Sequence, residues 1–340
     1  MTHDDERKKG TGIAEEVETI VSPVYEVGGS VRDDLMGRPA TDYDFSTPRD
    51  PAYIERKVRE AKKRPLLMGK RFGTIGLMID KRLVEITTFR VDHYEAGNRK
   101  PQVSFVDDIT ADLSRRDFTI NAIARRKGRI IDPFNGRKDI DGKLIRCVGE
   151  AATRFREDPL RMLRAARLAA QLGFVIDETT VRAMARKAHR ILDVSKERWV
   201  GELDRLLMTA EVATGLRYLM DTGLLTYMIP ELALQRDYNQ NNYHHSHDLW
   251  EHTVRVVSFA PLDHRMRWAA LLHDIAKPFV RVEKEDRSVY PRHDLLGAEM
   301  VGRLGRYLKW SKRRTEGVRM LVQGHMEDDS PLRDADSRAK

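Results

Sequence analysis

The chain has 340 residues, of which 41% are hydrophobic and 34% are charged, so it can bury more than one core. Lys and Arg exceed Asp and Glu by 61 to 53, a net charge of +8 that suits polyanionic partners without requiring them. The single cysteine, Cys147, excludes an intramolecular disulfide framework and favours a reducing compartment, the cytoplasm. No apolar run reaches the roughly 18 residues of a membrane helix, and the N-terminus carries no signal-peptide core, so no membrane contact is expected.

The pattern of the sequence changes three times along the chain. Residues 1–19 begin as a polar run and are predicted to form a disordered tail. Short β-rich runs alternate with glycine turns over residues 20–149, which predicts a mixed-sheet head. Helical periodicity follows over residues 150–240, and a histidine-rich segment opens a third, also helical, region at 241–340. The predicted fold class is therefore α+β, with a sheet-containing head followed by all-α parts.

Three elements can be predicted with their boundaries. Residues 74–80 and 82–90 are two β-rich runs joined at Lys81, which predicts paired strands. Residues 158–174 carry leucines at helical spacings, and Gly173 follows as a suitable C-cap.

Carboxylates gather near the first strands. Asp42 and Asp44 are one residue apart, so on a strand they point to the same face and repel each other unless a cation lies between them. Oxygen ligands of this kind suit Mg²⁺, which is bound by one or two carboxylates together with substrate phosphates. Glu85 is a candidate third carboxylate or an ordinary surface strand residue. A pair of aspartates alone is more often a solvated strand end than a metal site.

Two glycines precede this pair. Gly28 and Gly29 end an apolar run, where they allow a ligand to approach the backbone, and the following residues would offer N–H groups to a phosphate. Arg32 could add a charge-assisted contact to the same phosphate. Together with Asp42 and Asp44, these residues indicate metal-assisted nucleotidyl transfer, in which ions activate a hydroxyl and neutralise the leaving pyrophosphate.

The spacing from GGSVRD to DYDF resembles the signature of the nucleotidyltransferase superfamily, and in particular of class II tRNA nucleotidyltransferases, the CCA-adding enzymes and bacterial poly(A) polymerases. Four later segments match the family's motifs in order, namely residues 88–105, 114–124, 132–146 and 157–167. Within the first of them, Arg99 and Pro101 fit the pattern, whereas Tyr94 lies one place early and Gly97 replaces an acid. The resemblance implies a polymerase-β-like head followed by a helical neck and body.

The resemblance also implies roles for individual residues. Arg116, or Arg115 in its place, would contact the nucleotide, and Asp117 and Asn121 would hold the site together. Arg90 and Asp92 lie on the loop that the family uses to switch from cytidine to adenosine addition. A salt-bridged corner between a strand and a helix is the alternative reading of residues 115–121.

The fourth motif can also be interpreted from its chemistry. Asp158 and Arg161 are three residues apart, which on a helix places them on one face. The carboxylate can accept from the exocyclic amine of cytosine or adenine and the guanidinium can donate to the ring nitrogen beside it, so that uracil and guanine are rejected. Arg164 and Arg167 continue the stripe and could reach the triphosphate. A solvated basic helix face is the alternative.

The third region carries a second pattern of ligands. His252, His273 with Asp274, His293 and His325 are separated by helical segments, and the run WAALLHDIAKP resembles the HD metal-dependent phosphohydrolase superfamily. Neutral imidazoles and a carboxylate can hold a divalent transition metal, which lowers the pKa of a bound water.

The pattern expected of an HD site ends with an aspartate on a later helix. Asp334 and Asp336 are available, but the run PLRDADSRAK is interpreted as a helix start, which predicts a truncated domain or a missing last ligand. His244, His245 and His247 lie outside the pattern and are interpreted as loop or cap residues.

The resulting hypothesis is a Mg²⁺-dependent enzyme that adds CCA to the 3′ end of tRNA from CTP and ATP. Addition of A alone, or of CC alone, and a poly(A) polymerase are alternatives within the family. An HD phosphohydrolase with an RNA-binding head and a non-catalytic tRNA-binding protein are alternatives outside it. The sequence does not specify an oligomeric state.

Overall fold

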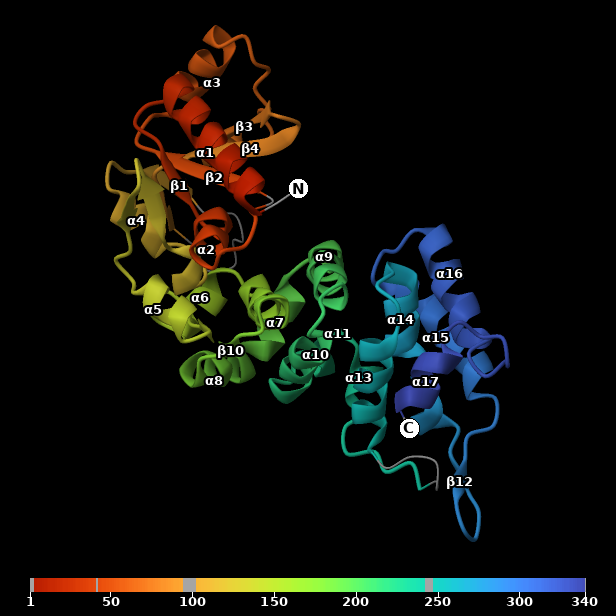
Figure 1. Ribbon diagram of the computed structural model, residues 1–340. Coiled ribbons are helices and arrows are strands. Elements are labelled where there is room, and N and C mark those ends of the chain that lie inside the picture. The colour runs from red at the N-terminus through yellow and green to blue at the C-terminus, as the bar shows by residue number, and fades with distance from the viewer. Residues whose placement is uncertain (1–2, 41, 94–101, 242–246, 340) are drawn as a thin grey trace. The chain divides into compact units, whose positions relative to one another are not determined.

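The computed structural model describes residues 3–40, 42–93, 102–241 and 247–339, with side chains from residue 12 onward (Figure 1). The chain forms two compact units, residues 1–157 and 158–340. The first division therefore falls shortly after the predicted end of the head, and the predicted boundary at 240 remains a prediction. No helix in the described part of the chain is long and apolar enough to span a membrane.

The first unit is built on a six-stranded sheet in the order β3-β4-β2-β1-β7-β8. Its strands are β1 (Tyr25–Val27), β2 (Tyr43–Thr47), β3 (Thr74–Ile79), β4 (Arg82–Thr88), β7 (Ala124–Arg126) and β8 (Arg129–Ile131). Strands β2 and β4 run parallel and the other neighbours antiparallel, so the sheet is mixed, as predicted. A separate hairpin pairs β5 (Arg90–His93) with β6 (Gln102–Phe105). The short strand β9 covers Leu144–Ile145.

The two strands predicted around Lys81 form the hairpin β3–β4. Asp80 and Lys81 both have positive φ, +47° and +63°, which is the two-residue turn that matches the twist of antiparallel strands. The register pairs Ile79 with Arg82 and places Gly76 opposite Glu85. The prediction of paired strands is confirmed.

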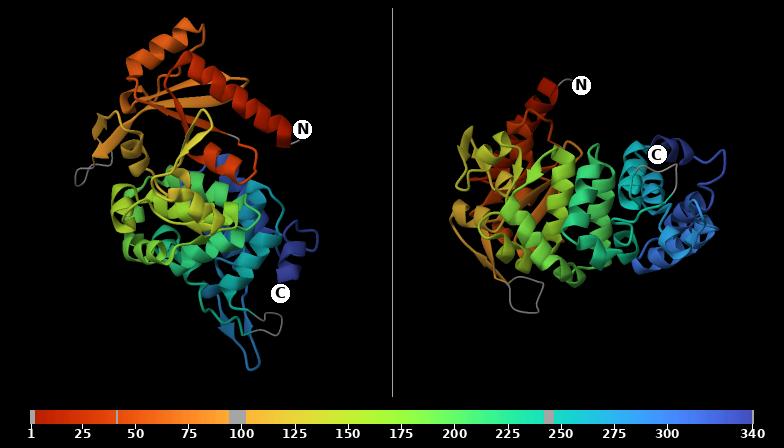
Figure 2. Two further views of the ribbon diagram at one scale, coloured as in Figure 1. Left: turned by 60° about the vertical axis from the view of Figure 1, so that its left-hand side comes forward. Right: turned by 90° about the horizontal axis from the view of Figure 1, so that it is seen from below.

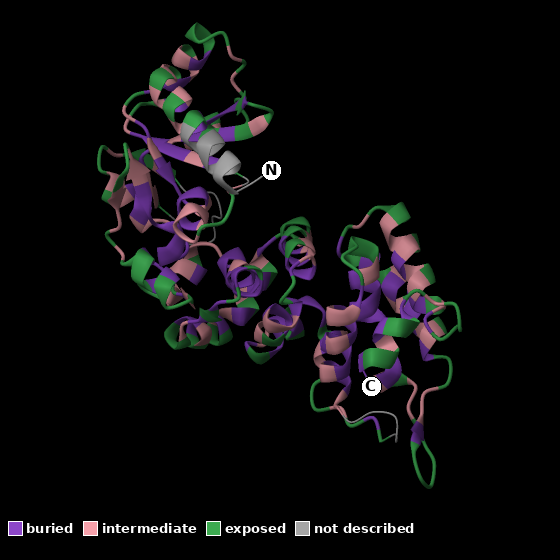
Figure 3. Ribbon diagram, viewed as in Figure 1, coloured by how far each residue is buried: buried purple, intermediate pink, exposed green. Residues whose placement is uncertain are grey.

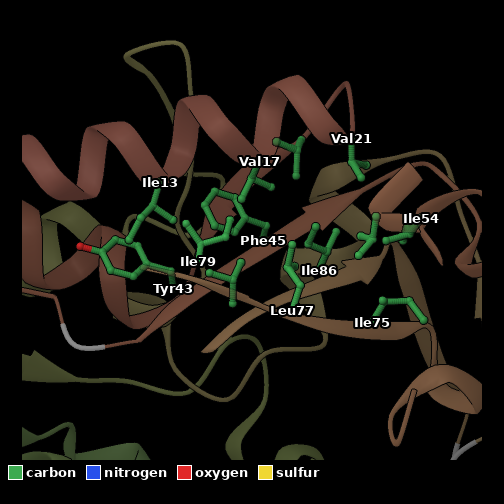
Figure 4. Packing of buried hydrophobic residues seen from close by; sticks show 13 residues of the cluster. Ile13, Val17, Val21, Tyr43, Phe45, Ile54, Ile75, Leu77, Ile79 and Ile86 are labelled. Atoms are coloured by element: carbon green, nitrogen blue, oxygen red, sulfur yellow. The ribbon is translucent and has the colours of Figure 1, made fainter. Parts of the chain in front are cut away.

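Side chains alternate between the two faces of a strand, so the central strands have two different faces. Most residues of β2 and β4 are buried or half-buried (Figure 3). Phe45 on β2 and Ile86 on β4 point into the main core, together with the side chains of β3 on that face. Helices α1 (His3–Ile20) and α3 (Pro51–Glu60) cover this face of the sheet and complete the core (Figures 2 and 4). Asp44, Ser46 and Glu85 alternate with the core residues and therefore lie on the opposite face.

The N-terminal segment differs from the disordered tail predicted for residues 1–19. It forms helix α1, His3–Ile20, and Ile13 and Val17 are almost fully buried against the sheet (Figure 4). The polar residues at the start of the chain led to the prediction of disorder. Apolar side chains nevertheless recur at Ile13, Val17 and Val21, a spacing that forms a stripe along a helix. The free energy of burying that stripe orders the segment.

The remaining helices of the first unit lie between and after the strands. They are α2 (Gly29–Leu35), α3 (Pro51–Glu60), η1 (Lys70–Phe72), α4 (Ile109–Ser114), η2 (Thr119–Asn121), α5 (Gly136–Asp141) and α6 (Ala151–Glu157). A second, smaller core of this unit contains Val27, Leu113, Ala122, Ala124 and Val148.

The second unit is almost entirely helical. Its first half contains α7 (Leu160–Leu172), β10 (Val175–Ile176), α8 (Glu178–Lys187), η3 (Ala188–Asp193), α9 (Lys196–Leu207), α10 (Val212–Asp221), α11 (Leu224–Met228) and α12 (Pro230–Ala233). Its second half contains α13 (Leu249–Phe259), α14 (His264–Leu272), η4 (Lys277–Phe279), β11 (Val282–Glu283), β12 (Ser288–Val289), α15 (His293–Tyr307), α16 (Lys312–Gln323) and α17 (Arg333–Ala339). Gly173 ends α7 in the left-handed conformation, with φ +70°, which confirms the predicted C-cap.

Candidate active site

Three carboxylates converge on the face of the sheet that lies opposite the main core. Asp44 on β2 is in parallel register with Glu85 on β4, and Asp42 lies just before β2. Burial raises the pKa of Glu85, and the negative charges of Asp44 and Asp42 raise it further. Like charges that repel each other in this way are stabilised by a cation between them, so this donor set fits a divalent ion that prefers oxygen ligands. Glu85 is exposed, yet it lies close enough to Asp44 and Asp42 for their charges to act on it.

Gly28 lies beside these carboxylates and its backbone explains why a glycine stands there. Its φ of +81° and ψ of −138° belong to a region that is essentially open to glycine alone. A Cβ on Gly28 would lie 3.1 Å from Arg116 Nη1 and 3.6 Å from Asp44 Oδ2. A Cβ on Gly29 would make only ordinary contacts with Arg32. Of the two predicted glycines, only Gly28 is required by the geometry of the site.

Arg32 is largely buried in the structure and is engaged by other side chains. Its Nε donates to Asp33 Oδ1 at 2.8 Å and its Nη1 donates to Asn121 Oδ1 at 2.6 Å. Asn121 in turn donates to Asp117 Oδ1 at 3.1 Å. Asp117 and Asn121 thus hold Arg32 against the start of α2, in agreement with the holding role that the resemblance implies for them.

Arg116 is the arginine of the RRDFT motif that approaches the carboxylates. Its Nη2 lies 3.4 Å from Ser46 Oγ, and Ser46 is two residues after Asp44 on β2. Arg115 turns instead toward Asp112 and Asp92. Arg90 forms an ion pair with Asp92 and donates to the carbonyl of Phe72. The predicted loop residues Tyr94, Gly97, Arg99 and Pro101 lie outside the described residues.

The fourth motif lies at the start of the second unit, and its local structure corrects one prediction. Helix α7 begins at Leu160, so Asp158 precedes the helix instead of sharing a face with Arg161. Pro159 disfavours the helical conformation for the residue before it, which separates α6 from α7. Asp158 Oδ1 accepts from the N–H of Leu160 at 3.1 Å, and Oδ2 accepts from Arg198 Nη2 at 2.7 Å. Arg198 is a contact that the sequence did not reveal.

The arginines of α7 differ in their surroundings. Arg161 is buried and Arg164 is half-buried. Arg167 donates from Nε to Glu202 Oε2 at 2.6 Å and from Nη1 to Gln171 Oε1 at 2.6 Å. These contacts join α7 to α9, so the structure gives Arg167 a packing role within the unit and leaves its predicted phosphate contact without support.

A second cluster of ligand side chains lies in the second half of the second unit. The predicted residues come from separate elements: His252 from α13, His273 and Asp274 from the end of α14, His293 from the start of α15 and His325 from the end of α16. All five are buried. The structure brings together the whole predicted set.

Asp274 divides this cluster into two groups. Its Oδ2 lies 3.1 Å from His273 Nε2 and 3.5 Å from His252 Nε2. Its Oδ1 lies 3.3 Å from His293 Nε2 and 3.7 Å from His325 Nε2. Each oxygen of one carboxylate therefore faces its own pair of imidazoles, an arrangement that can hold two cations on either side of Asp274.

The imidazoles are oriented for metal binding by the backbone. The Nδ1 atoms of His273, His293 and His325 lie 2.6–2.8 Å from the carbonyls of Ala270, Tyr290 and Val322. A ring that donates its Nδ1–H in this way turns the lone pair of Nε2 toward the cluster. Burial lowers the pKa of His325 to about 4, so this ring is neutral at pH 7, as a metal ligand must be.

The prediction that the last ligand is missing was wrong. Asp336 lies on α17 with Oδ1 3.1 Å from His252 Nε2, and it completes the group formed with His273. The segment does form a helix, but Ala335 and Ala339 are buried and pack that helix onto α13, which places Asp336 over the cluster. The dipeptide Ala335-Asp336 is the feature of the sequence that could have identified this last ligand.

Lys277 is a further residue of this cluster that the sequence pattern did not indicate. Its ammonium donates to Gln240 Oε1 at 2.9 Å and lies 2.7 Å from Asp274 Oδ2. His247, which the sequence placed outside the pattern, contacts Arg255 instead, and His244 and His245 lie outside the described residues.

Three family models match successive parts of the chain. They are described as "Poly A polymerase head domain" at residues 24–146, "Probable RNA and SrmB- binding site of polymerase A" at 173–235 and "HD domain" at 249–339. The CCA-adding enzyme of Geobacillus thermodenitrificans is 39% identical over 267 residues, and that of Geobacillus kaustophilus is 41% identical over 228 residues. The chain therefore contains a poly A polymerase head domain, an RNA-binding region and an HD domain in this order, and it is similar to CCA-adding enzymes.

The chain matches only part of the length of these relatives. The two alignments cover 76% and 66% of this chain but 62% and 55% of the Geobacillus proteins, so the chain spans less than two thirds of these curated relatives. The crystal structure of the Bacillus stearothermophilus CCA-adding enzyme in complex with CTP is 29% identical, with a TM-score of 0.69. That likeness covers 98% of this chain and 79% of the other.

Proposed function

We propose that this protein is a template-independent tRNA nucleotidyltransferase that adds CCA to tRNA 3′ ends from CTP and ATP and releases pyrophosphate. The observation that supports it most is the convergence of Asp42, Asp44 and Glu85 on the sheet face beside Gly28. The CCA-adding enzymes among the relatives supply the reaction class. CTP, ATP and the tRNA 3′ end are the partners that follow from it.

Asp42 and Asp44 would hold Mg²⁺, with Glu85 as a further oxygen donor. Bound there, Mg²⁺ supplies charge neutralisation for the attacking hydroxyl and the leaving pyrophosphate. The guanidinium of Arg116 lies beside Gly28 and close to Asp44, where it can stabilise negative charge on the triphosphate. Arg32, a residue of α2 that is fixed by Asn121, contributes further positive potential.

Asp158 and Arg161 would select the base. The carboxylate accepts from an exocyclic amine and the guanidinium donates to the neighbouring ring nitrogen, so cytosine and adenine are accepted and uracil and guanine are rejected. Asp158 is held by Arg198 and by the N–H of Leu160, which limits the positions that its oxygens can take. A carboxylate that is already fixed discriminates better between bases, because its side chain loses less conformational freedom when the nucleotide binds.

Incorporation of labelled CTP and ATP into three tRNA transcripts tests the proposal. The transcripts end before CCA, after the first C and after CC. Addition of C, C and A to the shortest transcript supports CCA addition. Addition of A only to the transcript ending in CC would identify an A-adding enzyme, addition that stops at CC would identify a CC-adding enzyme, and long adenosine tracts would identify a poly(A) polymerase.

The variant Asp42→Ala gives the matched test of the carboxylate site. It should abolish incorporation while RNA binding on filters is retained, because the tRNA is bound mainly through phosphate contacts elsewhere. Asp141→Ala, at an exposed position at the end of α5, is the control that should keep incorporation. Failure of the unmodified protein to extend any transcript would contradict the proposed function. The cytoplasm is the location we expect for an enzyme with this substrate.

The histidine cluster favours a second activity, hydrolysis of a phosphoester by the HD domain. Asp274 with its two pairs of imidazoles would hold divalent transition ions, and Asp336 would complete the first group. Such ions supply a hydroxide at neutral pH. In the reaction the water oxygen bonds to phosphorus, the ester P–O bond breaks and the leaving oxygen takes up a proton. Lys277 can place positive charge next to the cluster.

Hydrolysis of bis-p-nitrophenyl phosphate in the presence of Mn²⁺ or Ni²⁺ tests this second activity. His273→Ala should remove the hydrolysis and keep nucleotide incorporation, whereas Asp42→Ala should have the opposite effect. No hydrolysis with any of the tested ions, in a protein shown to bind them, would leave the cluster as a structural metal site.

A further inference from the structure

Asp112 is a buried carboxylate in the first unit that has no role in the proposed reaction so far. It lies on α4 with 0% of its surface exposed. A carboxylate without charged partners is costly to bury, and its retention inside a fold requires several donors. Asp112 has them: two arginines, a hydroxyl and a backbone N–H surround it.

The two oxygens of Asp112 have different partners. Oδ1 accepts from Arg115 at 3.0 Å (Nε) and 2.8 Å (Nη2), and from the backbone N–H of Arg90 at 3.3 Å. Oδ2 accepts from Ser46 Oγ at 3.0 Å and lies 3.6 Å from Arg116 Nη2. The positive charges of Arg115 and Arg116 overcome the effect of burial and hold the pKa of Asp112 below its ordinary value.

These partners come from three separate elements. Ser46 lies on β2, on the same face as Asp44 and two residues after it. Arg90 is the first residue of β5 and so begins the hairpin β5–β6. Arg116 reaches from the end of α4 toward Gly28 and the Asp44 carboxylate. One carboxylate therefore connects the strand of the catalytic aspartate, the base of a hairpin and the arginine beside the site.

A second ion pair strengthens the connection to the hairpin. Asp92 on β5 lies 3.0 Å from Arg90 Nε and 3.7 Å from Arg115 Nη1. Arg115 thus links Asp112 to Asp92, and the hairpin is attached to α4 both through its backbone and through its side chains. Loss of the Asp112 charge would leave two half-buried arginines without the carboxylate that they share.

We propose that Asp112 is a positioning residue for nucleotidyl transfer. It fixes the hairpin β5–β6 against strand β2 and orients Arg116 toward Asp44. This inference rests on the proposed function, because the positioned groups are those of the nucleotidyl-transfer site. Asp112 itself does not touch the carboxylates and acts through Arg116 and Ser46.

The variant Asp112→Asn tests the proposal, because it keeps the size of the side chain and removes its charge. Glu26→Gln is the matched control: Glu26, on strand β1, is also buried and forms an ion pair with Arg125 on the neighbouring strand β7. Its register partner, Phe45, points into the core, so Glu26 lies on the face away from Asp44.

The activity readout is kcat for nucleotide incorporation, measured with saturating substrates at a temperature at which both variants are folded. We expect Asp112→Asn to lower kcat by about tenfold or more, because Arg116 loses its orientation, and Glu26→Gln to change it by less than about twofold. Equal losses in both variants, or an unchanged kcat in Asp112→Asn, would overturn the proposal.

Backbone hydrogen exchange gives a second readout that does not depend on activity. Asp112→Asn should speed exchange in residues 90–93 and 102–105, because the N–H of Arg90 loses a charged acceptor, whereas Glu26→Gln should leave the hairpin unchanged. Protection of the hairpin that stays as in the unmodified protein would refute the positioning role. If the unmodified protein incorporates no nucleotide while the hairpin responds as expected, the proposed function fails and the structural link stands.

Discussion

Arg198 Nη2 donates to Asp158 Oδ2 at 2.7 Å, so the carboxylate proposed to read the base is held by a residue forty positions later. Arg198 lies on α9, and its side chain is 49% exposed. An ion pair this exposed adds little to stability. The ion pair matters because it orients the carboxylate of Asp158, which lies just before α7.

Arg198→Ala should therefore alter selection more than stability. We expect the ratio of UTP to CTP misincorporation to rise about tenfold, because the freed carboxylate samples more orientations, while unfolding changes by less than about 1 kcal/mol. Single-nucleotide incorporation with each of the four triphosphates measures the ratio. Arg182→Ala, which removes a similar exposed pair with Glu178 on α8, is the control. An unchanged ratio in Arg198→Ala would argue against the orienting role.

Gly28→Ala and Gly29→Ala should differ strongly although the residues are adjacent. At Gly28 the backbone conformation costs an alanine about 1–3 kcal/mol, and the new methyl group would press on Arg116. At Gly29 the methyl group meets only the flexible end of Arg32. Incorporation kinetics with thermal melts should show the larger loss for Gly28→Ala, and equal losses would contradict the geometry.

The histidine cluster should bind two divalent transition ions per chain. His293→Ala and His252→Ala should each lose one ion, because the two imidazoles face different oxygens of Asp274. Metal analysis after dialysis against Mn²⁺, performed in the Asp42→Ala background, measures the number without the head. His264→Ala, at an exposed position, is the control that should keep both ions. A single ion in the unmodified cluster would refute the prediction.

Asp204 should stabilise the second unit. Trp268 Nε1 donates to Asp204 Oδ1 at 2.7 Å, and Arg314 donates to Asp204 while it lies 4.6 Å from the ring centre of Trp310. Asp204→Ala leaves both donors without their charged acceptor, so we expect a loss of about 2–4 kcal/mol in denaturant unfolding. Lys309→Ala removes an exposed pair with Glu197 and should have no measurable effect. Similar losses in the two variants would argue against this assignment.

The contribution of Asp112 to stability should depend on pH. Its pKa is lower in the folded protein than in the unfolded chain, so the stabilisation is complete above the unfolded pKa of about 3.9 and is lost as the pH falls through the lowered folded value. The difference in unfolding free energy between the unmodified protein and Asp112→Asn should be constant from about pH 5 upward and shrink below about pH 4. A difference that does not change with pH would mean that the charge of Asp112 is not what stabilises the fold.

Sequence alone was enough where the decisive pattern lies within one element. The turn at Lys81 and the cap at Gly173 depend on neighbouring residues, and the structure has both as predicted. Of the predicted aspartate pair, Asp44 lies on strand β2 and Asp42 lies just before it. The histidines also indicated one metal-binding cluster, because the segment around His273 and Asp274 resembles the HD pattern. The prediction of a disordered N-terminal tail was wrong. The apolar stripe in this segment stabilises a helix only because the sheet provides an apolar face against which it packs.

Tertiary structure decided which side chains meet across the chain. Asp112 joins residues of β2 and β5, Arg198 reaches back to Asp158, and Asp336 returns to His252 through the packing of α17 on α13. Arg167 has the positive charge expected of a phosphate ligand, but its guanidinium donates to Glu202 inside the second unit. Contacts between distant segments depend on how whole helices and sheets bury their apolar faces, and that information is spread over the chain rather than written in any local spacing.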